Sequence, residues 1–138
     1  MSSFLFSKIM VHLIQVDIPN STGVTLELNA EYSPTTVESF LRNLPFTVEL
    51  NVWGDEIYSS SSPISIAEEN AQSSVSLCDV AYWPTGKAIC LFYGPTPISK
   101  KGEISPASPV NIIGKIINPD KSILDTAEGK LATFRLKS

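Results

Sequence analysis

Positive charge, cysteine, histidine and long apolar runs are all scarce in this sequence of 138 residues. Ten Lys and Arg residues stand against fourteen Asp and Glu residues, which gives a formal net charge of −4, and no basic block is present. A nucleic-acid backbone or an anionic membrane surface would find no electrostatic footprint on such a chain. No apolar run approaches the ~20 residues that span a bilayer. We therefore predict neither a nucleic-acid partner nor membrane association.

The small number of cysteine and histidine residues excludes disulfide-rich proteins and proteins with Cys/His metal sites. Two cysteines, Cys78 and Cys90, are too few for a disulfide framework, and His12 is the single histidine, so no Cys/His cluster has metal-site spacing. No phosphate-binding or dinucleotide-binding motif is present. The apolar N-terminus has no basic residue ahead of it and no small-residue cleavage site after it. We expect a reduced, cytoplasmic protein without metal or cofactor, in which residues 1–8 extend the first strand.

The sequence does contain enough apolar residues for one folded domain over residues 1–138, with 43% hydrophobic against 17% charged residues. In residues 24–30 every second residue is apolar, which predicts a strand with one buried face. An aliphatic run over residues 9–16 predicts a second strand. The Pro, Asn, Ser and Gly residues at 19–23 predict a hairpin turn that pairs the two strands antiparallel.

One helix is predicted over residues 34–44. Ser33 suits the N-cap, and Pro34 suits the first helical position, where its missing N–H costs nothing. Four apolar residues at positions i, i+3, i+4 and i+7 then form a single apolar face. Pro45 ends the helix. A helix of this length makes one lid on a sheet rather than a bundle.

Further strands are predicted over residues 46–50, 56–59, 75–83, 87–93, 110–117 and 131–136. Between them, a serine-rich segment at 59–62 and a Gly/Pro/Ser-rich segment at 94–109 are predicted as loops that are long enough to form the rim of a pocket. Eight short strands, one or two helices and frequent turn residues predict a mainly β protein, built as a closed barrel with capping helices.

Several segments resemble cyclophilins. Residues 26–40, LELNAEYSPTTVESF, are similar to the cyclophilin strand-to-helix passage, and residues 110–116, VNIIGKI, are similar to a late cyclophilin strand. WGDEIY at 53–58 and DVAYWP at 79–84 resemble a small prokaryotic-type family of cyclophilin-like proteins for which no function is established. Three further motifs extend this resemblance over roughly residues 9–120: GKA at 86–88, FYGPTP at 92–97 and SPASPVN at 105–111. The resemblance implies a closed eight-stranded cyclophilin-like barrel capped by helices.

The sequence differs from true cyclophilins at the positions of their catalytic residues. Prolyl isomerases of that fold use an Arg two residues after a Phe on the strand that follows the first helix, and a Phe-x-Met-x-Gln segment that forms the proline pocket. The corresponding residues 51–60 contain neither Arg nor Gln and carry carboxylates instead, and the two arginines, Arg42 and Arg135, lie elsewhere. Because carboxylates repel a carbonyl oxygen, we predict weak or absent prolyl isomerase activity.

Aromatic and acidic residues gather in two segments, 53–58 and 79–83, which hold both Trp residues. Aromatic walls with a few polar groups are typical of a small-molecule site, and a carboxylate held against an indole has a raised pKa that suits acid or base work. We predict one pocket at the barrel surface, with Glu56 and Tyr58 as candidate catalytic residues and, as candidate ligand-binding residues, Trp53, Tyr82, Trp83, Lys87 and Tyr93. Each of these residues also has a purely structural interpretation. The Trp residues are then part of the core, Asp55 and Asp79 are turn residues, and Lys87 is a solvated side chain.

Three functions fit these residues. The first is a module that binds a small organic molecule or a short peptide, since no nucleophile–base pair or metal set is present. The second is a cofactor-independent isomerase or lyase, with Glu56 as acid or base and Tyr58, Tyr82 or Lys87 as donor to a developing oxyanion. The third is a protein-interaction module, and the acidic composition is compatible with a homodimer without requiring one.

Overall fold

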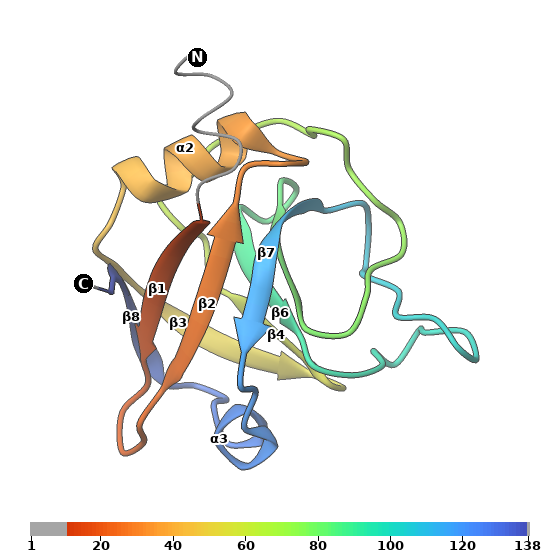
Figure 1. Cartoon of the computed structure of the whole chain (residues 1–138). Coiled ribbons are helices and arrows are strands. Elements are labelled where there is room, and N and C mark those ends of the chain that lie inside the picture. The colour runs from red at the N-terminus through yellow and green to blue at the C-terminus, as the bar shows by residue number, and fades with distance from the viewer. Residues whose placement is uncertain (1–10, 138) are drawn as a thin grey trace.

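The computed structural model describes residues 11–137, which form a closed antiparallel β-barrel with a helix at each end (Figure 1). The strands are β1 (Val11–Asp17), β2 (Val24–Asn29), β3 (Phe46–Trp53), β4 (Glu56–Ser59), β5 (Asp79–Trp83), β6 (Ala88–Phe92), β7 (Asn111–Ile117) and β8 (Leu131–Leu136). Their order around the barrel is β1-β2-β7-β5-β6-β4-β3-β8. The helices are α2 (Pro34–Arg42) and α3 (Lys121–Asp125). The predicted eight-stranded barrel is confirmed, whereas the predicted extension over residues 1–8 lies outside the described residues.

The barrel interior is filled by the inward-facing residues of all eight strands. In β2 the buried residues alternate with half-buried ones, as the period-two pattern predicted. At one end, α2 inserts Phe40 into an aromatic group with Phe46 and Phe134. The rings of Phe46 and Phe134 are stacked at 5.1 Å between centroids, and Phe40 meets Phe46 edge-on at 5.4 Å. Burying each such ring stabilises the fold by about 1.5–3 kcal/mol, so α2 closes the barrel through its apolar face.

The N-terminus of α2 is capped from a distant part of the chain. Ser33 occupies the N-cap position, but its side chain makes no capping hydrogen bond. The Glu69 carboxylate instead accepts hydrogen bonds from the backbone N–H groups of Thr35 (3.0 Å) and Thr36 (2.9 Å). The negative charge also suits the positive end of the helix. The helix itself is confirmed, and it ends two residues earlier than predicted, with Asn43 as its C-cap.

The side chain of Asn111 fastens the connection between β4 and β5 to the barrel. Asn111 is fully buried at the start of β7. Its Oδ1 accepts a hydrogen bond from the backbone N–H of Glu69 (2.9 Å), and its Nδ2 donates to Thr36 Oγ1 and to the carbonyl of Ala67, both at 3.1 Å. One amide therefore joins a strand, a helix and a long connection.

The strand predicted over residues 75–83 is shorter in the structure. It begins at Asp79, because Cys78 has a positive φ of 71° and the Asp79 carboxylate accepts the backbone N–H of Ser76 at 2.8 Å, which forms a turn. Val75 makes only an isolated antiparallel bridge with Ile104. Asp79 is thus the turn acceptor that its place at a strand start indicated.

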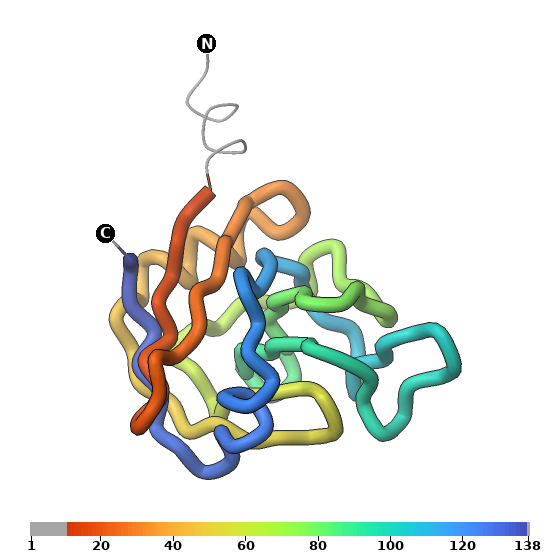
Figure 2. Tube along the Cα trace, turned by 60° about the horizontal axis from the view of Figure 1, so that its bottom comes forward, coloured from red at the N-terminus to blue at the C-terminus, as the bar shows by residue number. Residues whose placement is uncertain are grey.

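A second, smaller core lies on the outer face of β5 and β6. Because neighbouring strand residues face opposite ways, Val80 and Leu91 point into the barrel while Ala81, Cys90 and Phe92 point out. These outward residues are nevertheless buried. They pack with Val75 and Val110 and with residues of the loop 94–109, which projects from the side of the barrel (Figure 2). This outer cluster borders the candidate site.

In the described part of the chain, no helix has the length and apolar content required to cross a membrane.

We expect Asn111→Ala to lower the free energy of unfolding by about 1–3 kcal/mol, because it removes the three hydrogen bonds of a fully buried side chain. Urea denaturation measures this loss. Asn51→Ala is the matched control: Asn51 is half-buried, and its side chain makes a single hydrogen bond, at 3.3 Å, to the Tyr58 carbonyl. Equal losses in the two variants would contradict a special role for Asn111.

Candidate functional site

A pocket of about 210 Å³ lies on the outer face of the barrel, beside the second core. Its walls come from the four strands β3, β4, β5 and β6, from the loop between β6 and β7 and from the residue that precedes β7. The lining residues are Trp53, Glu56, Tyr58, Trp83, Cys90, Pro106, Ala107 and Val110. Four of the seven predicted site residues therefore meet in one hollow.

Strand register brings these side chains together. Glu56 pairs with Trp53 on β3 and with Phe92 on β6, and Tyr58 pairs with Cys90. Residues directly opposite each other on neighbouring strands share a face of the sheet. Because Ile57 points into the barrel core, Glu56 and Tyr58 on either side of it point outward.

Glu56 is the polar group of the pocket whose position is most unusual. The residue is 5% exposed, and its Oε1 is buried without a hydrogen-bond partner. Burial raises the pKa of Glu56 to about 7, and the Cys90 thiol offsets only part of this effect. An unpartnered buried carboxylate is costly, because removing charge from water is repaid only by a hydrogen bond or an opposite charge.

Cys90 lines the same pocket but is not a nucleophile at neutral pH. Burial raises the pKa of its thiol well above the usual range, and the nearby Glu56 carboxylate adds to the effect. The thiolate is the reactive form of cysteine, so a thiol held protonated is inert. Cys90 serves as an apolar wall and a weak donor beside Glu56.

The indole of Trp83 is held at both ends. Its Nε1 donates a hydrogen bond to Ser108 Oγ at 2.5 Å, which ties the long loop to β5. At Gly86 a Cβ atom would lie 2.6 Å from the ring carbon Cζ3, so the absence of a side chain there lets the indole lie against the turn. The loop 94–109 thus forms a wall of the pocket, as its length indicated, whereas the serine-rich segment 59–62 lines no part of it.

Tyr82 is not part of the pocket. It is fully buried in the barrel interior, where its hydroxyl donates a hydrogen bond to the Ile64 carbonyl at 2.8 Å. Tyr82 and Trp83 are neighbours on β5, so their side chains leave opposite faces of the strand and cannot line one hollow. The structure therefore separates these two predicted site residues.

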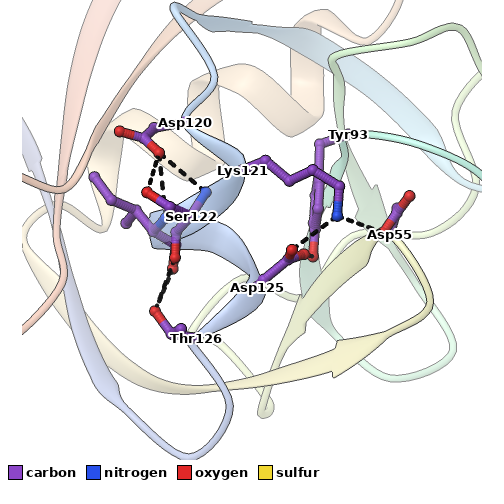
Figure 3. Close-up of polar contacts among 8 residues, drawn as sticks. Asp55, Tyr93, Asp120, Lys121, Ser122, Asp125 and Thr126 are labelled. Carbon is purple, nitrogen blue, oxygen red and sulfur yellow. Dashed lines mark hydrogen bonds and ion pairs between the residues drawn. The ribbon is translucent and has the colours of Figure 1, made fainter.

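Tyr93 lies in a separate polar group that joins the barrel to α3 (Figure 3). Its hydroxyl donates to Asp125 at 2.8 Å, and the Lys121 ammonium lies 5.8 Å from the ring centroid. Lys121 also pairs with Asp125 at 2.7 Å and with Asp55 at 3.7 Å. Burial and the Asp125 carboxylate raise the pKa of Tyr93 above its ordinary value. Tyr93 and Asp55 thus dock α3 and do not line the pocket.

Lys87 and Asp79 also lie outside the pocket. Lys87 is exposed in the turn between β5 and β6, with a positive φ of 52°. The buried Asp79 pairs with Lys115 at 2.6 Å, next to the turn it forms with Ser76. Within residues 11–137, no group of three or more His, Cys, Asp and Glu side chains is arranged to hold a metal ion.

Comparison with known proteins agrees with this architecture. The family model described as Cyclophilin-like matches residues 12–135. The chain belongs to the cyclophilin-like family. Its barrel is also similar to the solution structure of a hypothetical protein from Archaeoglobus fulgidus, with 38% sequence identity, a TM-score of 0.78 and coverage of 92% of this chain and 95% of that chain. No curated protein matches the sequence.

Both arginines of this cyclophilin-like protein lie away from the pocket. Arg42 is exposed on α2, where it pairs with Glu38 one helical turn away. Arg135 on β8 pairs with Asp17 on β1 at 2.6 Å. Neither lines the hollow that contains Glu56. The pocket therefore has a carboxylate in place of a guanidinium as its charged group.

Sequence reasoning missed four lining residues of the cyclophilin-like pocket: Cys90, Pro106, Ala107 and Val110. Cys90 is found only once the register of β4 against β6 is known, since it lies opposite Tyr58. The other three fall within or next to the loop 94–109, whose irregular backbone has no periodicity from which a facing side can be predicted.

We expect the stability of the protein to fall as the pH rises from 4.5 to about 7. The pKa of Glu56 is raised from 4.5 to about 7 by folding, so in this range the folded state binds more protons than the unfolded chain, and deprotonation favours unfolding. The full difference corresponds to roughly 3 kcal/mol. Glu56→Gln removes this dependence and is more stable than the parent at pH 8 but not at pH 4.5.

Urea denaturation at pH 4.5, 6 and 8 measures this difference. Glu49→Gln is the control, because it removes the same charge from an exposed position on β3. A constant difference in stability between the parent and Glu56→Gln at all three pH values would show that Glu56 titrates normally.

Proposed function

We propose that this cyclophilin-like barrel binds a small organic molecule, or one side chain of a short peptide, in the pocket on its outer face. The observation that carries the proposal is the buried Oε1 of Glu56, which has no hydrogen-bond partner. A fold that leaves a carboxylate oxygen unsatisfied gives up stability unless something else satisfies it. A ligand whose hydrogen-bond donor reaches the Glu56 carboxylate from the hollow restores the missing interaction.

The size and chemistry of the pocket support a ligand with one ring. A cavity of ~150 Å³ in a protein interior accommodates benzene, and this hollow measures about 210 Å³. Trp53, Tyr58 and Trp83 supply aromatic walls that attract flat or apolar groups. A few polar groups among apolar walls, here the Glu56 carboxylate and the Tyr58 hydroxyl, fix the orientation of a ligand, which is the usual composition of small-molecule sites.

A second candidate function is general acid or base catalysis by Glu56 in an isomerase or lyase reaction. It is favoured by the pKa of about 7, because a group that is half-protonated near neutral pH both accepts and donates protons efficiently. Of the donors proposed from the sequence, Tyr58 lines the pocket, while Tyr82 lies inside the barrel and Lys87 is exposed. Tyr58 is therefore the donor that this mechanism would use.

We expect ring-bearing fragments such as benzyl alcohol to bind with dissociation constants in the micromolar to millimolar range, given the few atoms that the pocket accepts. Two-dimensional NMR titration measures binding through the indole resonances of Trp53 and Trp83. Trp53→Ala is expected to weaken binding about tenfold, because it removes an aromatic wall. Tyr32→Ala, which removes an exposed ring outside this pocket, is expected to leave binding unchanged.

The binding proposal would be contradicted if the fragments shifted only NMR resonances of other surfaces. It would also be contradicted if millimolar concentrations of fragment shifted no resonance.

We expect the protein to show little or no prolyl isomerase activity. No guanidinium lines the pocket to bind the carbonyl of an Xaa-Pro bond, and the Glu56 carboxylate would repel that oxygen. The cis-to-trans rate of a short Xaa-Pro peptide, measured by exchange NMR at equilibrium, is expected to equal the uncatalysed rate. Acceleration that disappears in Trp53→Ala would place an isomerase site in this pocket and contradict the prediction.

A further inference from the structure

The charged side chains of the pocket indicate which sign of charge a ligand can carry. Eight side chains line it, and within residues 11–137 Glu56 is the only ionisable carboxylate among them, with no Lys, Arg or His. The other titratable groups that face Glu56 are the Cys90 thiol on β6 and the Tyr58 hydroxyl on β4, and neither carries positive charge. An anionic ligand would therefore meet a carboxylate with no counter-charge.

The aromatic walls favour the opposite sign of charge. The faces of Trp and Tyr rings carry a negative potential, so they attract an ammonium group electrostatically. A neutral group of the same shape makes only dispersion contacts with the same rings. Two indoles and one phenol surround the same hollow as the Glu56 carboxylate. Aromatic rings combined with a desolvated carboxylate form a site for an organic cation, because each supplies negative potential that water does not screen.

We propose that the pocket selects an organic ammonium ion, a primary or substituted amine attached to one apolar ring or short chain, with the nitrogen beside the Glu56 carboxylate and the apolar part between the indoles of Trp53 and Trp83. This proposal rests on the proposed binding function and adds the class of ligand. It also accounts for the buried Oε1 of Glu56, which has no hydrogen-bond partner: the charge of the ligand stabilises the carboxylate in its place.

Binding of such a cation depends on pH in a defined direction. The ammonium pairs with ionised Glu56, and the pKa of about 7 leaves this form in the minority below neutral pH. An apparent dissociation constant rises in inverse proportion to the fraction of the competent form. Affinity for a ligand that stays charged throughout is therefore expected to be about tenfold weaker at pH 6 than at pH 8.

The test compares three probes of one shape: benzylammonium, neutral benzyl alcohol and benzoate. Two-dimensional NMR titration of the full chain at pH 6 and pH 8 gives each dissociation constant from the indole resonances of Trp53 and Trp83. At pH 8 benzylammonium is expected to bind at least about tenfold more tightly than benzyl alcohol, and benzoate more weakly than both. Glu56→Gln is expected to abolish the preference for the cation and its pH dependence, while Glu49→Gln keeps both.

The outcomes separate the two proposals. Equal affinity for benzylammonium and benzyl alcohol, a preference for benzoate, or a cation preference that survives in Glu56→Gln would overturn the organic-cation assignment and leave the pocket as a binding site for other ligands. If none of the three probes shifts the indole resonances, the proposed binding function itself fails, and the ligand class fails with it.

Discussion

A closed barrel gives each strand residue only two directions, inward to a shared core or outward. The interior of this barrel is already filled, by residues from all eight strands and by Phe40 from α2. Apolar residues on the outer face of β5 and β6 therefore need a cover of their own. The loop between β6 and β7 supplies it, and the hollow that contains Glu56 borders this cover. The site is thus a consequence of how the outer face is covered.

The same constraint accounts for the chemistry of Glu56. Its neighbour Ile57 belongs to the barrel core, so Glu56 must face outward, where most carboxylates meet water. Here the indole-lined hollow removes that water and supplies only the weak Cys90 thiol donor, so burial raises the pKa of Glu56. The fold accepts a loss of stability at this residue, which is common where a protein keeps a group available for a ligand. Glu56 and the Glu69 carboxylate differ in this respect, since Glu69 is satisfied by the N-terminus of α2.

Much of the fold was predictable from the sequence, and the failures have identifiable physical causes. Alternation and turn residues predicted the eight strands and the β1–β2 hairpin, because both signals are local. The cap of α2 was not predictable, since Glu69 reaches the helix from more than thirty residues away. Tyr82 does not line the predicted pocket, because side chains alternate along a strand and its neighbour Trp83 takes the outward position. Tyr93 contacts Asp125 and Lys121 of α3 instead of the pocket, and this contact depends on tertiary structure, which no local pattern predicts.

Membership of the cyclophilin-like family therefore explains the barrel and does not by itself assign an activity. The barrel provides two sets of positions, and because the inner set is filled by the core, only the outer set is open to a ligand. In this chain the outer positions of β3 and β4 carry Trp53, Glu56 and Tyr58, with both arginines in surface ion pairs elsewhere. A guanidinium attracts a carbonyl oxygen, whereas a desolvated carboxylate between aromatic rings attracts a donor or a cation. The same scaffold with the opposite charge at its outer hollow is thus suited to a different class of ligand.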